Sequence, residues 1–250
     1  MGALPITACL IFQRLGHLAA MPDTVKARRG EARLPSAAVV VVAIALYALL
    51  PEQLIIGPRL VIPALEVMLL IALLVVNPYR MTRDSPWERV AALTLVALIA
   101  VANAVALVLL LRQLVTTDDS QSVELLIAAG QVWLTNVIVY GLAFWELDRG
   151  GPVARTHVAR DRLPRADFRF PQDEDHDTID EVQAGSSKVS DWVPAIVDYL
   201  YVSLSNSSAF SPTDTMPLST RAKILMGIES TSALVISVLV IAKGVGGLGH

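Results

Sequence analysis

Five long apolar runs with almost no charge limit how this chain can fold more than any other feature. Three of them, 34–51, 90–111 and 125–145, hold no charged residue, and the other two, 60–79 and 224–242, hold one glutamate each. The chain is 54% hydrophobic and only 17% charged, whereas an average soluble protein is about 45–50% apolar and about 25% charged. Since a helix that crosses a bilayer needs about 20 mostly apolar residues, the runs predict an all-α, polytopic helical membrane protein with about five to six membrane-embedded helices.

The runs also divide the chain into parts. We expect a cytoplasmic basic arm over 1–36, a four-helix transmembrane bundle over 37–146, a polar and partly disordered cytoplasmic loop over 147–191, and a pore-like helix-turn-helix membrane hairpin over 192–245. The predicted crossing helices are 37–55, 59–77, 89–112, 123–146 and 220–243. Residues 1–20 are only weakly apolar, and a compact basic leader would begin at Met21, so the start of the protein at Met1 or Met21 is left open.

Lysine and arginine gather on one side of the predicted helices. They are frequent in the N-terminal arm, in the loop after the second span and in 147–191, whereas the two alternate loops offer only Arg59 and Arg112. Cytoplasmic loops carry an excess of these residues. We therefore predict a multi-pass protein of the cell inner (plasma) membrane with a cytoplasmic N-terminus and a cytoplasmic 147–191.

Segment 147–191 has a basic half, an acidic half and few large apolar residues. A segment of this composition cannot bury a core of its own, so we expect a solvated loop. Its arginines over 147–169 would attract anionic lipid head groups by about 1 kcal/mol per charge. The acidic run 173–181 does not fit a calcium-binding EF-hand loop, because Thr178 replaces the required glycine and Ala184 the required glutamate. No metal and no cofactor are predicted.

Polar residues within the predicted membrane segments are the candidates for a pore or cavity, because charges in lipid are costly and mark pathways or pairs. The candidates are Asp198, Ser205, Asn206, Ser208, Asp214, Glu229 and Glu66. For the amide and hydroxyl side chains, hydrogen bonding between packed helices is the alternative role. The two glutamates must be protonated, paired or in contact with water. Pairing with Arg59 and Arg221 and a water-filled cavity both remain open.

The helix predicted at 192–208 is too polar to face lipid on all sides. The side chains that share one of its faces at spacings of three and four are Asp198, Tyr201, Ser205 and Ser208. The helix either crosses the membrane, which makes six spans and places 211–220 outside, or re-enters the membrane from the cytoplasmic face. We expect the crossing, although it would place Arg221 and Lys223 outside, against the charge rule.

The order of elements from Asp198 onward resembles the pore module of tetrameric cation channels. The stretch 199-YLYVSL-204 resembles the aromatic pore helix, Asp214 lies at the aspartate that ends the filter, and Pro217 lies at the proline that follows it. Where a potassium filter reads Thr-Val-Gly-Tyr-Gly, this chain reads 209-AFSPT-213. Glycines let that backbone turn its carbonyls inward. The resemblance therefore implies a pore-like hairpin with a degenerate filter and no potassium selectivity.

Over most of its length the chain also resembles uncharacterised bacterial multi-spanning integral membrane proteins of unknown function. The stretches that carry this resemblance are 141-GLAFWELDRGGP-152, 167-DFRFPQDE-174 and 198–223. The resemblance implies no activity. No nucleotide-binding glycine loop, HExxH or GxSxG motif occurs, so we predict neither an enzyme nor a nucleic-acid-binding protein.

Two functions are consistent with these features. The first is an ion-channel-like permeation protein, in which the hydroxyl-rich helix and turn line a polar path between the subunits of a homo-oligomer. The alternative is a non-conducting membrane scaffold that binds a partner or anionic lipid through the 147–191 loop.

Overall fold

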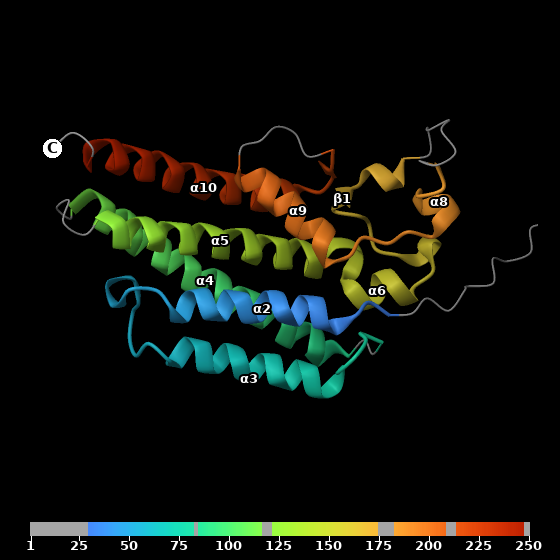
Figure 1. The fold of residues 1–250 in the computed structure, drawn as a ribbon. Coiled ribbons are helices and arrows are strands. Elements are labelled where there is room, and N and C mark those ends of the chain that lie inside the picture. The colour runs from blue at the N-terminus through green and yellow to red at the C-terminus, as the bar shows by residue number, and fades with distance from the viewer. Residues whose placement is uncertain (1–29, 83–84, 117–121, 175–182, 209–213, 248–250) are drawn as a thin grey trace, which may run out of the picture.

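The structure is a computed structural model that describes residues 30–82, 85–116, 122–174, 183–208 and 214–247. Long helices lie side by side in a bundle, and short elements gather at one end of it, the cap end (Figure 1). The bundle helices are α2 (Arg33–Ala48), α3 (Val61–Val76), α4 (Pro86–Thr116), α5 (Ser122–Leu147), α9 (Ile196–Ser207) and α10 (Thr220–Gly247). The cap consists of η3 (Asp148–Gly150), α6 (Pro152–His157), η4 (Arg160–Arg162), β1 (Phe168–Arg169), η5 (Pro171–Asp173), α8 (Ser187–Ser190) and β2 (Met216–Pro217). The 3₁₀ turn η1 (Glu52–Leu54) lies at the opposite, far end.

The all-α prediction is confirmed, and the apolar runs are helices. Three of these helices, α4, α5 and α10, are long and apolar enough to cross a membrane. The helices α2 and α3 are apolar but have 16 residues each, so each is about 24 Å long at about 1.5 Å per residue. The predicted first span is too long at its C-terminal end: α2 ends at Ala48, before Pro51, because proline cannot donate the backbone hydrogen bond that would continue the helix.

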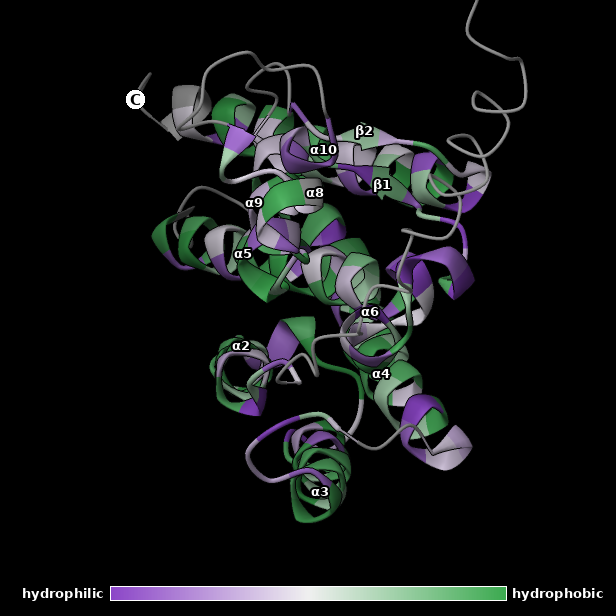
Figure 2. Cartoon of the chain, turned by 90° about the vertical axis from the view of Figure 1, so that its right-hand side faces the viewer, coloured by the Kyte–Doolittle hydropathy of each residue, from purple (hydrophilic) through white to green (hydrophobic). Residues whose placement is uncertain are grey.

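The centre of the bundle is α5, which packs against α2, α4, α9 and α10. In the most apolar 18-residue stretch of each helix, 61% of the residues are buried in α5, compared with 33% in α4 and 17% in α10. The outer helices therefore keep apolar side chains exposed; examples are Val101 on α4 and Ile241 on α10. The hydropathy view down the bundle shows α3 and α10 on opposite sides of it (Figure 2).

Helices α5 and α9 approach each other closely at Gly141. A Cβ atom at Gly141 would lie 2.7 Å from Leu200 Cδ2 and 3.2 Å from Leu200 Cα. The second of these atoms belongs to the backbone of α9, so a larger side chain would push the two helices apart. Gly130, on the same helix α5, has open space at its Cβ position. Of these two glycines of α5, Gly141 is therefore the one that helix packing requires.

We expect Gly141→Ala to destabilise the protein by about 1–3 kcal/mol, the usual cost of overpacking a core. Gly130→Ala is the matched control, and we expect it to be neutral or slightly stabilising because alanine is the better helix former. Thermal unfolding of both variants in the same detergent measures the difference. Equal unfolding midpoints would mean that α9 does not pack on α5 at this distance.

The chain does not cross the bundle at 192–208. Strand β1 pairs with β2 in antiparallel register, with Phe168 opposite Pro217, and the Leu218 amide donates to the Asp167 carbonyl at 2.7 Å. These contacts return the chain to the cap end before α10 begins. Helix α9 also begins at the cap end, where the Ile196 amide donates to Glu31 at 3.0 Å.

Because α9 and α10 both start at the cap end, they run in the same direction into the bundle, and α9 stops partway along α10 (Figure 1). The path of the chain therefore differs from the expected one: it enters the bundle at the cap end with α9 and is back at the cap end before α10 begins. A helix of 12 residues is also only about 18 Å long, too short for a bilayer core of about 30 Å.

The described part of segment 147–191 is a folded cap, not the solvated loop that we expected. Phe168 and Phe170 are buried, and their rings pack against Tyr199 of α9 at centroid distances of 6.3 and 5.4 Å. Phe144 of α5 packs on Phe168 at 5.0 Å. The segment has no core of its own, as its composition predicts. It is ordered because its few aromatic residues bury themselves against the ends of α5 and α9.

Candidate functional site

A buried carboxyl group inside the bundle, Glu229, is the centre of the candidate site. It lies in the third turn of α10, is fully buried, and contacts α9 side chains. Asn206 Nδ2 donates to Glu229 Oε2 at 2.7 Å, and Ser207 Oγ donates to Oε1 at 3.0 Å. Ser203 Oγ forms a third hydrogen bond with Oε1. A carboxylate can accept several hydrogen bonds, so the residues around Glu229 are suited to its charged form as well as its neutral form.

The hydrogen bonds of Ser203 are compatible with both protonation states of Glu229. Ser203 Oγ lies 2.7 Å from the Val137 carbonyl oxygen of α5 and also contacts Glu229 Oε1. A serine hydroxyl has a single proton to donate. If Ser203 donates to Val137, a protonated Glu229 donates to Ser203. If Glu229 is ionised, Ser203 turns and donates to Glu229. One hydroxyl rotation therefore accommodates both protonation states of Glu229.

The end of α9 adds a negative partial charge beside this carboxyl group. Helix α9 ends at Ser207, which itself contacts Glu229, and its C-cap is Ser208. The C-terminus of a helix is equivalent to about half a negative charge. The helix end and the carboxylate together favour a positive species, either a proton or a small cation. The oxygen atoms of Ser203, Ser207, Val137 and Glu229 are ligands of the hard type that small cations prefer.

Of the two alternatives left open for the buried glutamates, pairing with Arg59 and Arg221 does not occur among the described residues. Arg221 donates instead to Asp167, at 2.7 Å from Nε to Oδ1, and to the Leu147 carbonyl at 3.0 Å. Arg59 donates instead to the Ala48 carbonyl, from Nε at 2.9 Å and from a terminal nitrogen at 2.6 Å. Both arginines thus bind groups at the ends of the bundle, and among the described residues no basic side chain pairs with Glu229 or with Glu66.

Glu66 is buried on α3, but the structure does not bring it to the Glu229 site. Its side chain is 1% exposed, and within the described part of the chain neither carboxyl oxygen has a hydrogen-bond partner. It lies on the stripe of α3 residues that faces the bundle, together with Pro63, Leu70 and Leu73. Because α3 and α10 are on opposite sides of the bundle (Figure 2), the two glutamates are separate sites.

The other predicted site residues have different positions. Asp198 accepts the Ala195 amide at 2.7 Å and so caps the start of α9. Ser205 and Ser208 are half-buried, and Ser208 Oγ donates to the Leu204 carbonyl at 2.6 Å within the helix. Asp214 is exposed. Asn206 is the only predicted residue of α9 that reaches Glu229. Residues 209–213, which carry the resemblance to a channel filter, lie outside the described residues.

Sequence reasoning missed Ser203 and Ser207, because it chose the wrong face of α9. The predicted polar face includes Tyr201, whose side chain is 63% exposed. The buried face lies nearly opposite on the helix and includes Tyr199 and Val202 with the two serines. Apolar residues at spacings of three along the helix were the available signal for this face. The signal was weak because α9 carries hydroxyl groups on both sides.

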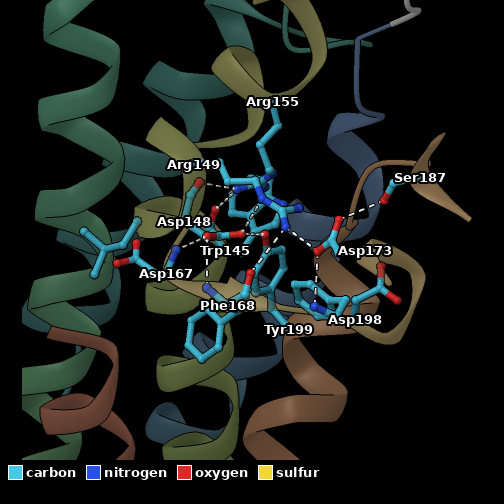
Figure 3. A network of polar contacts seen from close by, with 12 residues as sticks. Trp145, Asp148, Arg149, Arg155, Asp167, Phe168, Asp173, Ser187, Asp198 and Tyr199 are labelled. Atoms are coloured by element: carbon cyan, nitrogen blue, oxygen red, sulfur yellow. Dashed lines mark hydrogen bonds and ion pairs between the residues drawn. The ribbon is translucent and has the colours of Figure 1, made fainter. Parts of the chain in front are cut away.

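A second buried polar network, in the cap, holds the start of α9 in place (Figure 3). Asp148 is fully buried at the end of α5; its Oδ2 accepts the Tyr199 hydroxyl at 2.5 Å, and its Oδ1 accepts the Asp167 amide at 2.7 Å. Arg149, at the positive φ of 52°, forms an ion pair with Asp173. These contacts connect α5 and the strand segment to α9.

Arg155 is the largest fully buried side chain of this network. One terminal nitrogen donates to the carbonyls of Trp145 at 2.6 Å and Asp148 at 2.9 Å, and the guanidinium carbon lies 5.0 Å from the Tyr199 ring centroid. The other terminal nitrogen is 3.6 Å from the Glu31 carboxylate. Burial raises the pKa of Glu31, and the charge of Arg155 opposes this rise. Arg155 therefore joins α5, α9 and the chain before α2.

Comparison with known proteins returns no match: no protein-family model fits the chain, and no curated protein or solved structure is significantly similar to it.

Proposed function

We propose that this protein is a multi-pass membrane protein that binds a proton or a small monovalent cation at Glu229 and allows its permeation. The observation that carries the proposal is the fully buried Glu229, which is bonded to three polar side chains of a helix that ends beside it. In transporters, helices that stop within the membrane place their ends at ion sites near the midplane. Ionisable groups inside membrane bundles are rare, and they commonly mark ion or proton pathways, which supports the proposal.

In the proposed arrangement, α2, α3, α4, α5 and α10 cross the inner membrane and α9 re-enters it from the cytoplasmic side. The excess of arginine in the cap supports a cytoplasmic cap, because cytoplasmic loops carry the basic residues. Arg221 and Lys223, which opposed the charge rule in a six-span arrangement, then lie on the cap side and agree with it.

Ion flux into proteoliposomes tests this proposal. Purified protein is reconstituted, a potential is imposed, and entry of protons, sodium and potassium is followed separately. We expect flux above that of empty liposomes, and we expect Glu229→Gln to abolish it, because glutamine keeps the shape and hydrogen bonding of the site but cannot carry the exchangeable charge. Glu124→Gln is the matched control, because Glu124 is exposed near the start of α5. Silence with all three ions, or equal flux for the two variants, would contradict the proposal.

The alternative function is a non-conducting scaffold, and one observation favours it: the hydrogen bonds at Glu229 join α9 to α5 and α10 and leave the carboxyl with partners on both oxygens. In this case the cluster connects the helices, and the cap is the part that binds other molecules. The flux experiment separates the two functions, since a scaffold would give stable proteoliposomes without conductance.

A further inference from the structure

A cavity of about 200 Å³ opens in the cap, and arginines from three successive elements line it. They are Arg149 of η3, Arg155 of α6 and Arg160 of η4, and Asp173 and Trp192 complete the wall with apolar residues. Figure 3 shows the side chains of Arg149 and Arg155 extending to the same polar network. The cavity is several times larger than the roughly 30 Å³ that a water molecule occupies in the liquid, so it has room for a polyatomic ligand.

The carboxylate beside Arg155 is shared among several donors. Glu31 accepts a hydrogen bond from the Trp145 indole N–H at 3.0 Å and another from the Ile196 amide at 3.0 Å. Its distance to the Arg155 guanidinium is 3.6 Å, whereas a charge-assisted hydrogen bond between such groups measures about 2.7–2.9 Å. The charge of this buried arginine therefore interacts with three carboxyl groups, those of Glu31, Glu146 and Asp198.

Asp173, the acidic residue of the cavity wall, is shared in the same way. Besides the ion pair with Arg149, its carboxylate accepts the Ser187 hydroxyl at 2.8 Å and the Phe170 amide at 3.1 Å. Its two oxygens thus accept three hydrogen bonds. The residues that line the cavity include three arginines and one acid, and Asp148 and Asp191 lie near Arg149 and Arg160 outside the lining.

Arg160 is the side chain that can close on a ligand. Its side chain is 45% exposed, donates to the Trp192 carbonyl at 2.7 Å, and lies 3.7 Å from the Asp191 carboxylate. Its fork of N–H donors matches the oxygens of a phosphate group. Arginine pairs with phosphate through two parallel hydrogen bonds, and this geometry gives specificity as well as energy.

We propose that this cavity binds a phosphate group. The phosphate is carried either by a phospholipid head group or by a soluble compound, because the cap lies where the apolar helices end and both sources reach that level. Neighbouring Arg162 and Arg165 are exposed and raise the local concentration of either anion. This site is separate from Glu229 and does not depend on ion permeation.

Thermal unfolding of the full-length protein in a neutral detergent tests the site. Phosphatidylglycerol is compared with phosphatidylcholine, and inorganic phosphate is compared with chloride at equal ionic strength. Arg160→Gln removes a cavity arginine that is half-exposed, so the variant keeps the fold. Arg162→Gln is the matched control: it removes the same charge from the same turn, but its side chain is 81% exposed and does not line the cavity.

A ligand that binds the folded state raises the unfolding midpoint. We expect phosphatidylglycerol to raise the midpoint of the wild type and of Arg162→Gln, and to have a much smaller effect on Arg160→Gln. If inorganic phosphate gives the same pattern of midpoints, the site binds soluble phosphate compounds. If phosphatidylglycerol gives the pattern and inorganic phosphate does not, the site binds lipid. No rise with either anion, or equal rises in the two variants, would overturn the proposal. Because the readout is stability, the result is independent of the flux experiment.

Discussion

Replacing Arg155 with methionine should lower the free energy of unfolding by about 3–5 kcal/mol, the usual loss when one partner of a buried charged pair is removed. Methionine fills much of the same volume but donates no hydrogen bond. The carbonyl groups of Trp145 and Asp148 would lose a donor, and Glu31 would lose its nearby positive charge. Since these groups hold the cap on α5 and α9, the start of α9 should loosen first.

Chemical unfolding of Arg155→Met in detergent, followed by tryptophan fluorescence, measures this loss. Trp145 contacts the site directly, with its indole ring 5.9 Å from the Arg155 guanidinium carbon. Arg162→Met is the control for loss of one arginine, because that side chain is exposed. If the two variants unfold at the same denaturant concentration, the Arg155 network does not hold the cap in place.

Replacing Glu229 with leucine should cause the second largest loss of stability. Ser207 would lose the acceptor of its hydrogen bond, and Ser203 and Asn206 would each keep only a backbone carbonyl. A buried polar group left without its partner costs about 1–3 kcal/mol. The loss should be smaller when Ser203→Ala and Ser207→Ala are added, because removing both partners of a hydrogen bond is nearly neutral when the shapes are kept. Thermal unfolding in one detergent compares the single and triple variants.

Glu66→Leu is the matched comparison for Glu229→Leu, since both glutamates are buried in an apolar helix. Within the described residues the Glu66 carboxyl makes no hydrogen bond, so leucine there removes a desolvated polar group and leaves no donor without its partner. We expect Glu66→Leu to be neutral or stabilising. Equal losses for the two leucine variants would show that burial of the carboxyl group, and not the hydrogen bonds from α9, sets the stability at Glu229.

The helices could be predicted from hydropathy because apolar runs must be buried in lipid or in a protein core, and both environments require the backbone to satisfy its own hydrogen bonds. The predicted spans 89–112 and 220–243 lie within α4 and α10. The face of α9 was harder to predict. A helix of 12 residues with hydroxyl groups on several sides has no single polar stripe, and its contacts with α5 and with Glu229 of α10 distinguish one face from another.

The direction of the chain after α9 also depended on contacts between distant residues. Phe168 pairs with Pro217, and the Tyr199 hydroxyl reaches Asp148 across 51 positions in the chain. No local pattern predicts such a pair. Arg221 and Lys223 lie at the start of α10, at the same end of the bundle as the arginines of the cap, whereas the expected crossing would have separated them.

The amino-acid sequence by itself determined which long segments are helical, which are apolar enough to be buried in a membrane, and which two helices carry a carboxyl group inside an apolar run. These properties follow from residue type and spacing along one segment. Only the tertiary structure decided that the chain is back at the cap end after α9, and that Glu229 accepts hydrogen bonds from Ser203, Asn206 and Ser207. It also decided that the arginines of 147–191 belong to a folded cap. These outcomes depend on which groups become neighbours in space, because a buried charge or hydroxyl group is stable only where the fold supplies its partner.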